Sequence, residues 1–191
     1  MTAHEVKEMY ALDNGVRQLL LVESRGGSDA SARYYIKRDG GWWLLHRCSA
    51  FTGKNGLGKK AEGDGKTPTG TLHVKSAFGV LPNPGTTLPY INITPSTFAC
   101  DEDCEYYNHI IDTAQTHHQC MGEDMYNLVP YYNYGITTDY NEECDHQKGS
   151  NIFLHCKGPK DNTGGCIAFD EERMIEILTN CDASLVVTIR E

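Results

Sequence analysis

Residues 149–168 read GSNIFLHCKGPKDNTGGCIA, and this stretch decides the fold and the chemistry that we expect. Residues 151–155 form a compact apolar run of strand length that ends at His155. Cys166 follows eleven residues later, directly after two glycines. A single turn can fold the end of such a strand back beside the cysteine, so the sequence predicts a thiol and an imidazole in one site.

The two glycines before Cys166 add a second catalytic feature. Gly164 and Gly165 let a substrate approach the backbone closely and leave successive N–H groups free to point at it. Such donors stabilise the oxyanion of a tetrahedral intermediate by roughly 3 kcal/mol each. We expect the cysteine to attack as a thiolate, with the imidazole lowering its pKa and carrying the proton. The alternative for any single cysteine is a small buried apolar residue.

The rest of the sequence is rich in expected strands. Three runs of β-forming residues, separated by glycine-containing turns, indicate a meander of antiparallel strands at residues 18–24, 32–38 and 42–49. Further strands are expected at residues 71–77 and 185–189, and Asp170 is suited to cap a helix that follows it. We therefore expect a mainly β, single-domain fold of the β-sandwich or barrel type with one or two helices.

Length and charge limit the function classes. The 191 residues fit one domain, for which we take residues 18–191, with residues 1–17 as an N-terminal extension or the start of that domain. The net charge of −9 argues against a general binder of nucleic acid or anionic membranes, because such binders carry a basic surface. No apolar stretch is long enough for a membrane span. The first nine residues lack the apolar core of a signal peptide, so the chain as given is not expected to be a secretory precursor.

Charge is distributed unevenly along the chain. Residues 1–75 carry a balance of +4, whereas residues 76–191 carry −13. Residues 98–147 form an acidic, tyrosine-rich insertion within a longer stretch that contains no Lys or Arg, and we expect irregular loop with short helices there. Such a surface suits a cationic or amine-bearing partner, and the alternative is a solvated acidic surface.

Two blocks of sequence resemble the catalytic domain of the L,D-transpeptidases, the YkuD-type family. The hallmark of that family is a histidine that ends one strand and a Ser/Thr-x-Gly-Cys segment shortly after it, as at His155 and residues 163–166. The second block is residues 62–70, EGDGKTPTG, which resembles the segment leading into a core strand of that domain. With weaker matches elsewhere, the resemblance runs from about residue 18 to about residue 189.

The resemblance implies a peptidoglycan L,D-transpeptidase. Cys166 would take the acyl group of a stem peptide as a thioester, with release of a terminal D-amino acid, and His155 would serve as general base and then as general acid. The carbonyl of Cys156 would orient His155, and the N–H groups of Gly164, Gly165 and Cys166 would form the oxyanion hole. An amine of a second stem peptide would then attack the thioester to form a cross-link, whereas water would give an L,D-carboxypeptidase.

The resemblance also implies partners, location and substrate contacts. We expect peptidoglycan stem peptides as partners, no cofactor, and a place outside the cytoplasm, either in the bacterial cell envelope or secreted. Thr163, Tyr140 and Asn141 would contact the substrate.

The chain departs from the family pattern at two positions. Many members have a histidine where Gly164 stands and an arginine, thought to contact substrate, where Ala168 stands. We expect a lysine to replace this arginine, and we take Lys157 as substrate-binding. The other candidates, for each of which a solvated surface charge is the alternative, are Lys54, Lys59, Lys60, Lys66 and Lys160. The basic first part of the chain would receive a carboxylate-bearing donor, and the acidic later part an amine-bearing acceptor.

Eight cysteines are many for a chain of this length. Three of them are expected to pack in the core: Cys48, Cys156 and Cys181. In a strand, the side chain of Cys156 points away from that of His155. The other four apart from Cys166 lie in the acidic insertion, where two disulfides would stabilise a region with few apolar residues: Cys100, Cys104, Cys120 and Cys144. Three pairings of these four are open.

The same four cysteines support a rival function. Together with His117, His118 and His146 they offer enough ligands for a tetrahedral zinc site, although their spacing matches no standard zinc finger. A zinc-stabilised binding module of this kind would need no catalytic thiol at Cys166. A third possibility is an ordinary cysteine peptidase, which would share the dyad but cleave all-L peptides.

Overall fold

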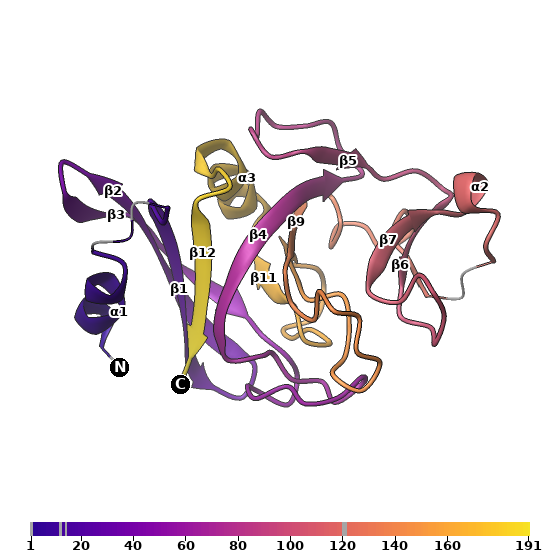
Figure 1. Ribbon diagram of the computed structural model, residues 1–191, viewed down its shortest axis with the longest axis horizontal. Coiled ribbons are helices and arrows are strands. Elements are labelled where there is room, and N and C mark those ends of the chain that lie inside the picture. Colours follow the sequence, from indigo (N-terminus) through magenta and orange to yellow (C-terminus); the bar gives the residue numbers. More distant parts are fainter. Residues whose placement is uncertain (1, 12, 14, 120–121) are drawn as a thin grey trace.

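The computed structural model describes residues 2–11, 13, 15–119 and 122–191, and it consists mainly of strands (Figure 1). The strands before the acidic insertion are β1 (Gln18–Gly26), β2 (Asp29–Arg38), β3 (Gly41–Phe51), β4 (Gly70–Gly79) and β5 (Tyr90–Asn92). In and around the insertion lie β6 (Thr97–Cys100), β7 (His109–Asp112), β8 (Glu123–Asp124) and β9 (Gly135–Thr138). The last strands are β10 (Phe153–Cys156), β11 (Ile167–Phe169) and β12 (Leu185–Arg190). The helices are α1 (Ala3–Met9), α2 (Thr113–Thr116) and α3 (Glu171–Asn180).

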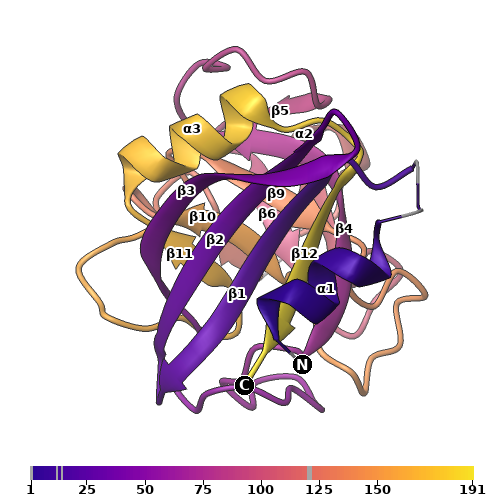
Figure 2. The ribbon, with the colours of Figure 1, turned by 90° about the vertical axis from the view of Figure 1, so that its left-hand side faces the viewer.

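The large sheet closes on itself. Its nine strands follow the order β12-β1-β2-β3-β11-β10-β9-β4-β5, and a further pairing joins β12 to β4. β12 runs parallel to β1 and antiparallel to β4, so the sheet curls into the barrel-like shape seen in Figure 2. This pairing removes the open edges that β12 and β4 would otherwise present. The expected mainly β, barrel-like fold is confirmed, and β1, β2 and β3 form the expected antiparallel meander.

Side chains on β1 alternate between two apolar cores. Leu20 and Val22 lie in the main core, which the curved sheet encloses, whereas Leu19 and Leu21 belong to a second core on the outer face. Helix α1 covers this outer face, and its Val6 is fully buried there (Figure 2). Burial of one such side chain contributes about 2 kcal/mol, so both faces of β1 stabilise the fold.

Helix α3 packs on the main core through one apolar face. Met174, Ile177 and Leu178 are all buried there, as their helical spacing predicts. Asp170 is the N-cap, as expected, but its side chain makes no capping hydrogen bond. The carboxylate instead pairs with the ammonium of Lys157 at 3.1 Å.

The acidic insertion contains more strand than we expected. β6 pairs with β7 and β8 in a small three-stranded sheet, and β9 joins the large sheet, while α2 is one short helix in the same region. In Figure 1 the small sheet lies at the end of the molecule opposite α1. These strands have two to four residues, which is too few for an alternating pattern to show in the sequence. The expectation of irregular loop with short helices holds for most of this region and was wrong where these short strands form.

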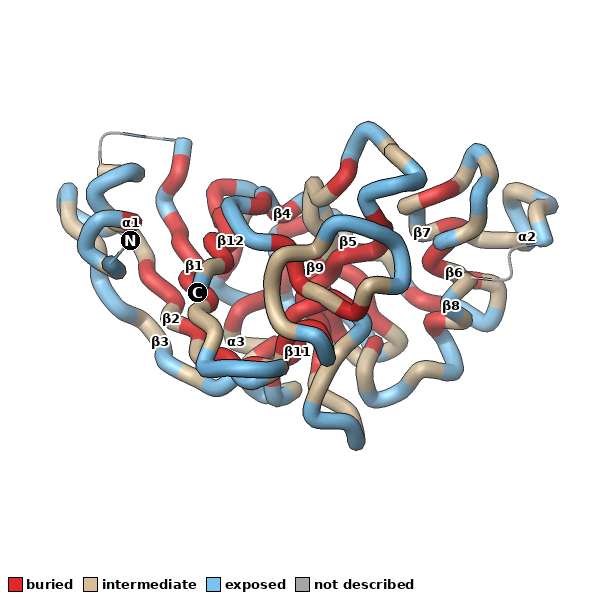
Figure 3. The backbone as a smooth tube through the Cα atoms, turned by 90° about the horizontal axis from the view of Figure 1, so that it is seen from below, coloured by how far each residue is buried: buried red, intermediate tan, exposed pale blue. Residues whose placement is uncertain are grey.

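The interior of the large sheet provides a rigid base for the functional site. Buried residues gather along its strands and exposed residues lie mostly on the connecting loops (Figure 3). β10 is buried along its whole length and lies between β9 and β11. No helix in the described ranges is both long and apolar enough to cross a membrane.

Candidate active site

A pocket of about 400 Å³ brings the two predicted catalytic side chains together. His155 and Cys166 form part of its wall, with the Thr-Gly-Gly turn that precedes the cysteine. Another part is formed by Asp101, which follows β6 of the small sheet, and by Tyr132, which lies between β8 and β9. The volume lies in the range of small-molecule and peptide-fragment sites.

Cys166 lies just before β11 and is held by two backbone groups of the segment that leads into β10. Its Sγ–H donates to the carbonyl oxygen of Asn151 at 3.1 Å, and the N–H of Phe153 donates to Sγ at 3.2 Å. Burial raises the pKa of Cys166 to about 12, and the charge of Glu123 acts in the same direction. The Phe153 hydrogen bond and the charge of Lys59 oppose this shift. The resting thiol is therefore protonated, and its raised pKa differs from the lowering by the imidazole that we expected.

His155 is buried on β10, and its ring is fixed by one hydrogen bond. Nδ1–H donates to the carbonyl oxygen of Cys156 at 2.7 Å, which leaves Nε2 as the basic nitrogen. The edges of the Tyr131 and Tyr132 rings pack against the imidazole at 6.1 and 5.6 Å between centroids. Burial lowers the pKa of His155 to about 4, although the hydrogen bond to Cys156 favours the charged form. At neutral pH this imidazole is an uncharged base.

The side chain of Cys156 faces away from the pocket. It lies in the main core, where its thiol donates to the carbonyl oxygen of Tyr134 at 3.5 Å, and burial raises its pKa to about 12. Cys181 is buried in the same core and Cys48 packs against it from a partly buried position. The three cysteines that we expected to be packing residues are placed accordingly.

The turn before Cys166 depends on one of its two glycines. A Cβ atom on Gly165 would lie 2.8 Å from the carbonyl oxygen of Lys66, a close backbone approach that excludes a side chain. A Cβ atom on Gly164 would meet no atom within 4 Å. The Thr163 hydroxyl closes the turn, because it donates to the carbonyl of Cys166 at 2.7 Å and accepts the N–H of Gly165 at 3.1 Å. Thr163 thus lines the pocket and also shapes the turn.

Lys59 brings a buried positive charge to the pocket. Its side chain is 2% exposed, and its ammonium lies 3.2 Å from the carboxylate of Asp64. The same carboxylate accepts the N–H groups of Lys60, Ala61 and Lys66. Burial opposes the charged form of Asp64, but these hydrogen bonds together lower its pKa to about 2. The second family-like block, residues 62–70, thereby builds the loop that holds Lys59.

Three carboxylates give the pocket an acidic side: Glu62, Asp101 and Glu123. Glu62 accepts hydrogen bonds from the hydroxyls of Tyr107 at 2.8 Å and Ser150 at 2.7 Å. Burial raises the pKa of Asp101, and the charge of Glu62 adds to this shift. Burial also raises the pKa of Glu123, and the charges of Asp101 and Glu62 add to it, although the Tyr132 hydroxyl donates to this carboxylate. The carboxylates therefore lie close enough to influence one another.

Comparison with known protein families shows the family to which the chain belongs. A family model described as the L,D-transpeptidase catalytic domain matches residues 28–189. The chain belongs to the L,D-transpeptidase family. No curated protein sequence matches it significantly.

Solved structures share the fold. A point mutant of the helical cell shape determining protein Pgp2 from Campylobacter jejuni is 19% identical with a TM-score of 0.53, over 92% of this chain and 47% of that one. Another Pgp2 structure is 17% identical with a TM-score of 0.51, over 98% of this chain and 55% of that one. Bd1075 from Bdellovibrio bacteriovorus is 14% identical with a TM-score of 0.51, over 92% of this chain and 48% of that one. The chain spans about half the length of these proteins, and at these identities the likeness concerns the fold alone.

Two positions that the family resemblance pointed to lie outside the pocket lining. The hydroxyl of Tyr140 donates to the carbonyl of Lys148 at 2.8 Å. The amide of Asn141 donates to the carbonyls of Asp145 at 2.9 Å and Gly149 at 2.8 Å. Both side chains hold the loop that leads into residues 149–151, and the substrate contacts expected of them stay a prediction.

Lys157, which we expected to bind substrate, also lies outside the pocket lining. Its ammonium pairs with Asp170 at 3.1 Å, contacts the hydroxyl of Ser49 at 2.9 Å and lies 4.6 Å from the ring centre of Phe51. Of the six candidate lysines, those that do line the pocket are Lys54, Lys59 and Lys160. Lys157 is held against β3 by its contacts with Ser49 and Phe51, so its substrate-binding role stays a prediction.

Several pocket residues were not singled out from the sequence. Glu62 had no role beyond the family-like block, and Tyr131 and Tyr132 were two of many tyrosines in the insertion. Asp101 and Glu123 fall in the acidic stretch that was proposed to receive an amine, but nothing in their local sequence separates them from the other acids. They come together only because the small sheet folds against the large one.

Proposed function

We propose that the protein is a peptidoglycan L,D-transpeptidase in which Cys166 takes the acyl group of a stem peptide as a thioester. The observation that carries this proposal is the shared pocket of Cys166 and His155, in which the Cys156 carbonyl holds Nδ1–H and leaves Nε2 basic. A thiol and an imidazole base in one pocket are the groups required for covalent acyl transfer. Membership of the L,D-transpeptidase family supports a peptidoglycan-related substrate.

The first step couples proton transfer to attack. Both partners are neutral at rest, and charges in a buried pocket are costly when they form separately. Nε2 of His155 takes the thiol proton as Sγ bonds to the substrate carbonyl carbon, and the carbonyl oxygen becomes an oxyanion. The N–H groups of Gly164 and Cys166 are the donors that we assign to this oxyanion, because the N–H of Gly165 already donates to Thr163. The imidazolium then gives its proton to the departing D-amino acid, and the thioester remains.

The second step transfers the acyl group to an amine. An amine of another stem peptide attacks the thioester carbon and His155 takes a proton from that amine. The C–S bond then breaks, and the imidazolium returns the proton to Sγ, which restores the thiol of Cys166. The acidic side of the pocket, formed by Glu62, Asp101 and Glu123, favours a cationic amine as acceptor. Lys59 is suited to the carboxylate of the donor peptide, in place of the arginine that many family members have. Water in place of the amine would give carboxypeptidase activity from the same thioester.

Intact mass spectrometry tests the proposal directly. We expect a tetrapeptide stem or a carbapenem to add its acyl mass to the wild-type protein and to Cys156→Ala, but not to Cys166→Ala. Cys156→Ala is the matched control, because that thiol is buried on the opposite side of β10. An all-L tetrapeptide serves as the stereochemical control, since turnover of that peptide would indicate an ordinary cysteine peptidase. Labelling that survives in Cys166→Ala, or no labelling of folded wild-type protein, would overturn the proposal.

A further inference from the structure

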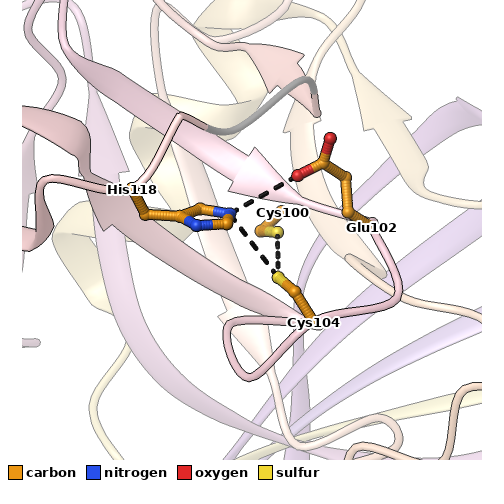
Figure 4. A group of neighbouring side chains, drawn as sticks. All are labelled: Cys100, Glu102, Cys104 and His118. Atoms are coloured by element: carbon orange, nitrogen blue, oxygen red, sulfur yellow. Dashed lines mark hydrogen bonds and ion pairs between the residues drawn. The ribbon is translucent and has the colours of Figure 1, made fainter.

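We infer that Cys100, Glu102, Cys104 and His118 form a structural zinc site in the small sheet, away from the pocket that holds Cys166. The four side chains converge from two separate segments, as Figure 4 shows. One ligand atom from each residue lies within 4.8 Å of every other. This inference is independent of the proposed function, because none of the four residues takes part in acyl transfer.

Three of the six distances between ligand atoms match the edges of a zinc tetrahedron. Typical zinc bond lengths and tetrahedral angles give edges of about 3.8 Å between two sulfurs, about 3.6 Å between sulfur and nitrogen, and about 3.4 Å between nitrogen and oxygen. The two Sγ atoms of Cys100 and Cys104 are 3.5 Å apart, and Sγ of Cys104 is 3.6 Å from Nε2 of His118. Nε2 of His118 is 3.4 Å from Oε2 of Glu102. All three edges therefore lie within about 0.3 Å of the values expected around a zinc ion.

The donor set selects zinc over the common alternatives. Two thiolates with an imidazole are ligands for zinc, whereas calcium and magnesium prefer oxygen ligands alone. A disulfide between Cys100 and Cys104 would need the sulfurs about 2 Å apart, which is well below the 3.5 Å observed. Cys144 lies apart from this cluster, with its Sγ 4.0 Å from Nδ1 of His109. Cys120, the fourth cysteine of the acidic insertion, lies outside the described residues.

The backbone around Cys104 supports a thiolate. Cys100 ends β6, and the turn that follows brings Glu102 and Cys104 back toward it. The N–H of Tyr106 donates to Sγ of Cys104 at 3.4 Å, an outer contact of the kind that stabilises metal-bound ligands. The ring of Tyr106 also packs against the His118 imidazole, with 5.0 Å between ring centres. These contacts orient two of the four ligands.

The small sheet needs such a support, because its own apolar core is minimal. The cluster around the site buries only Cys100 and Ile111, with three partly buried neighbours, among the described residues. A metal ion that joins β6 to the segment after α2 would fix the small sheet where apolar burial does not. The ion would therefore stabilise the wall that supplies Asp101 and Glu123 to the pocket.

Metal analysis of chelator-free protein tests the inference. We expect close to one zinc per chain in the wild-type protein and in Cys166→Ala, which separates the result from any failure of catalysis. Cys104→Ser and His118→Asn should lose the metal. Their matched controls, Cys144→Ser and His117→Asn, should retain it, because neither side chain belongs to the cluster. Retention of zinc in Cys104→Ser and His118→Asn would overturn the assigned ligands.

A second measurement covers the case in which a variant fails to fold. Cobalt added to metal-free wild-type protein should give the absorption bands of a tetrahedral thiolate site, and zinc should protect Cys104 but not Cys144 from alkylation. Folded wild-type protein that holds no zinc, gives no cobalt bands and has lost two protons by mass, with Cys100 linked to Cys104, would overturn the inference in favour of a disulfide.

Discussion

The thiol of Cys166 donates a hydrogen bond to the backbone carbonyl of Asn151 at 3.1 Å. Asn151 is buried in a left-handed conformation with φ of 53°, and its side-chain amide donates to the carbonyl of Cys100 at 3.0 Å. The N–H of Asn151 in turn donates to the side chain of Asn108 at 2.8 Å. One residue thus ties the nucleophile to the turn of the proposed zinc site.

Replacement of Asn151 should therefore affect both stability and acylation. We expect Asn151→Ala to lower the free energy of unfolding by about 1–3 kcal/mol, because alanine fits the left-handed region poorly and removes the bond to Cys100. Asn151→Gly should restore the conformation but not the hydrogen bond, and should lie between alanine and wild type. Urea unfolding and the rate of carbapenem acylation measure the two effects. A wild-type free energy of unfolding and acylation rate in Asn151→Ala would show that the hydrogen bonds of Asn151 contribute to neither stability nor acylation.

Buried, neutral His155 makes stability depend on pH. Its pKa is about 4 in the folded protein, below the ordinary value of about 6.5, so the unfolded chain binds the proton first as pH falls. The free energy of unfolding should decrease from about pH 6.5 down to about pH 4, by roughly 3 kcal/mol in total, and then level off with respect to this group. In His155→Gln this contribution should vanish. Urea unfolding of both proteins at several pH values checks the difference, and parallel curves would contradict the assigned pKa.

Much of the fold could be predicted because its signals are local. β1, β2 and β3 have nine to eleven residues and glycine turns between them, and α3 has a full apolar face. The shared pocket of His155 and Cys166 was also predictable, since the two residues lie on either side of one short connection. The acidic side of the pocket was not, because Asp101 and Glu123 reach it through packing of strands too short to predict. The protonated thiol was missed for a related reason, since burial of Cys166 follows from the whole fold.

The two glycines before the nucleophile should respond differently to substitution. Gly165→Ala places a methyl group 2.8 Å from the carbonyl of Lys66, so we expect a loss of about 1–3 kcal/mol of stability and slow acylation. Gly164→Ala meets open space and should stay within about 0.5 kcal/mol of wild type. Thermal unfolding of both variants is the measurement. Equal losses would contradict the close approach at Gly165.

Lys59 should contribute to donor binding through its charge. We expect Lys59→Met to raise KM for a carboxylate-bearing donor several-fold, with a smaller change in kcat, because the methionine keeps the volume and loses the ammonium. The neighbouring Lys60→Met is the control, since Lys60 is exposed and outside the pocket lining. Steady-state kinetics with donors that carry a free or an amidated carboxylate show whether the effect of Lys59→Met depends on the donor's charge. A KM that rises equally for both donors would argue against a role for the charge.

The carboxylates should matter chiefly for the acceptor. Glu123→Gln is expected to lower the ratio of cross-linked to hydrolysed product several-fold, while carbapenem acylation should not slow, because loss of this charge lowers the pKa of Cys166. Glu143→Gln removes the same charge from an exposed position that pairs with Lys148 and should leave the ratio unchanged. Product analysis by liquid chromatography and mass spectrometry gives the ratio. An unchanged ratio in Glu123→Gln would assign the acceptor site elsewhere.

The buried, protonated state of Cys166 also has a consequence for chemical damage. Peroxides and other oxidants attack thiolates at exposed positions, and both the burial and the raised pKa of this thiol oppose such attack. The side chain is held between two backbone groups and, in the proposed mechanism, ionises only as it meets an acyl carbon. On the proposed function, the nucleophile therefore rests in a form resistant to sulfenic acid formation, and we expect the partly exposed Cys144 to be oxidised before it.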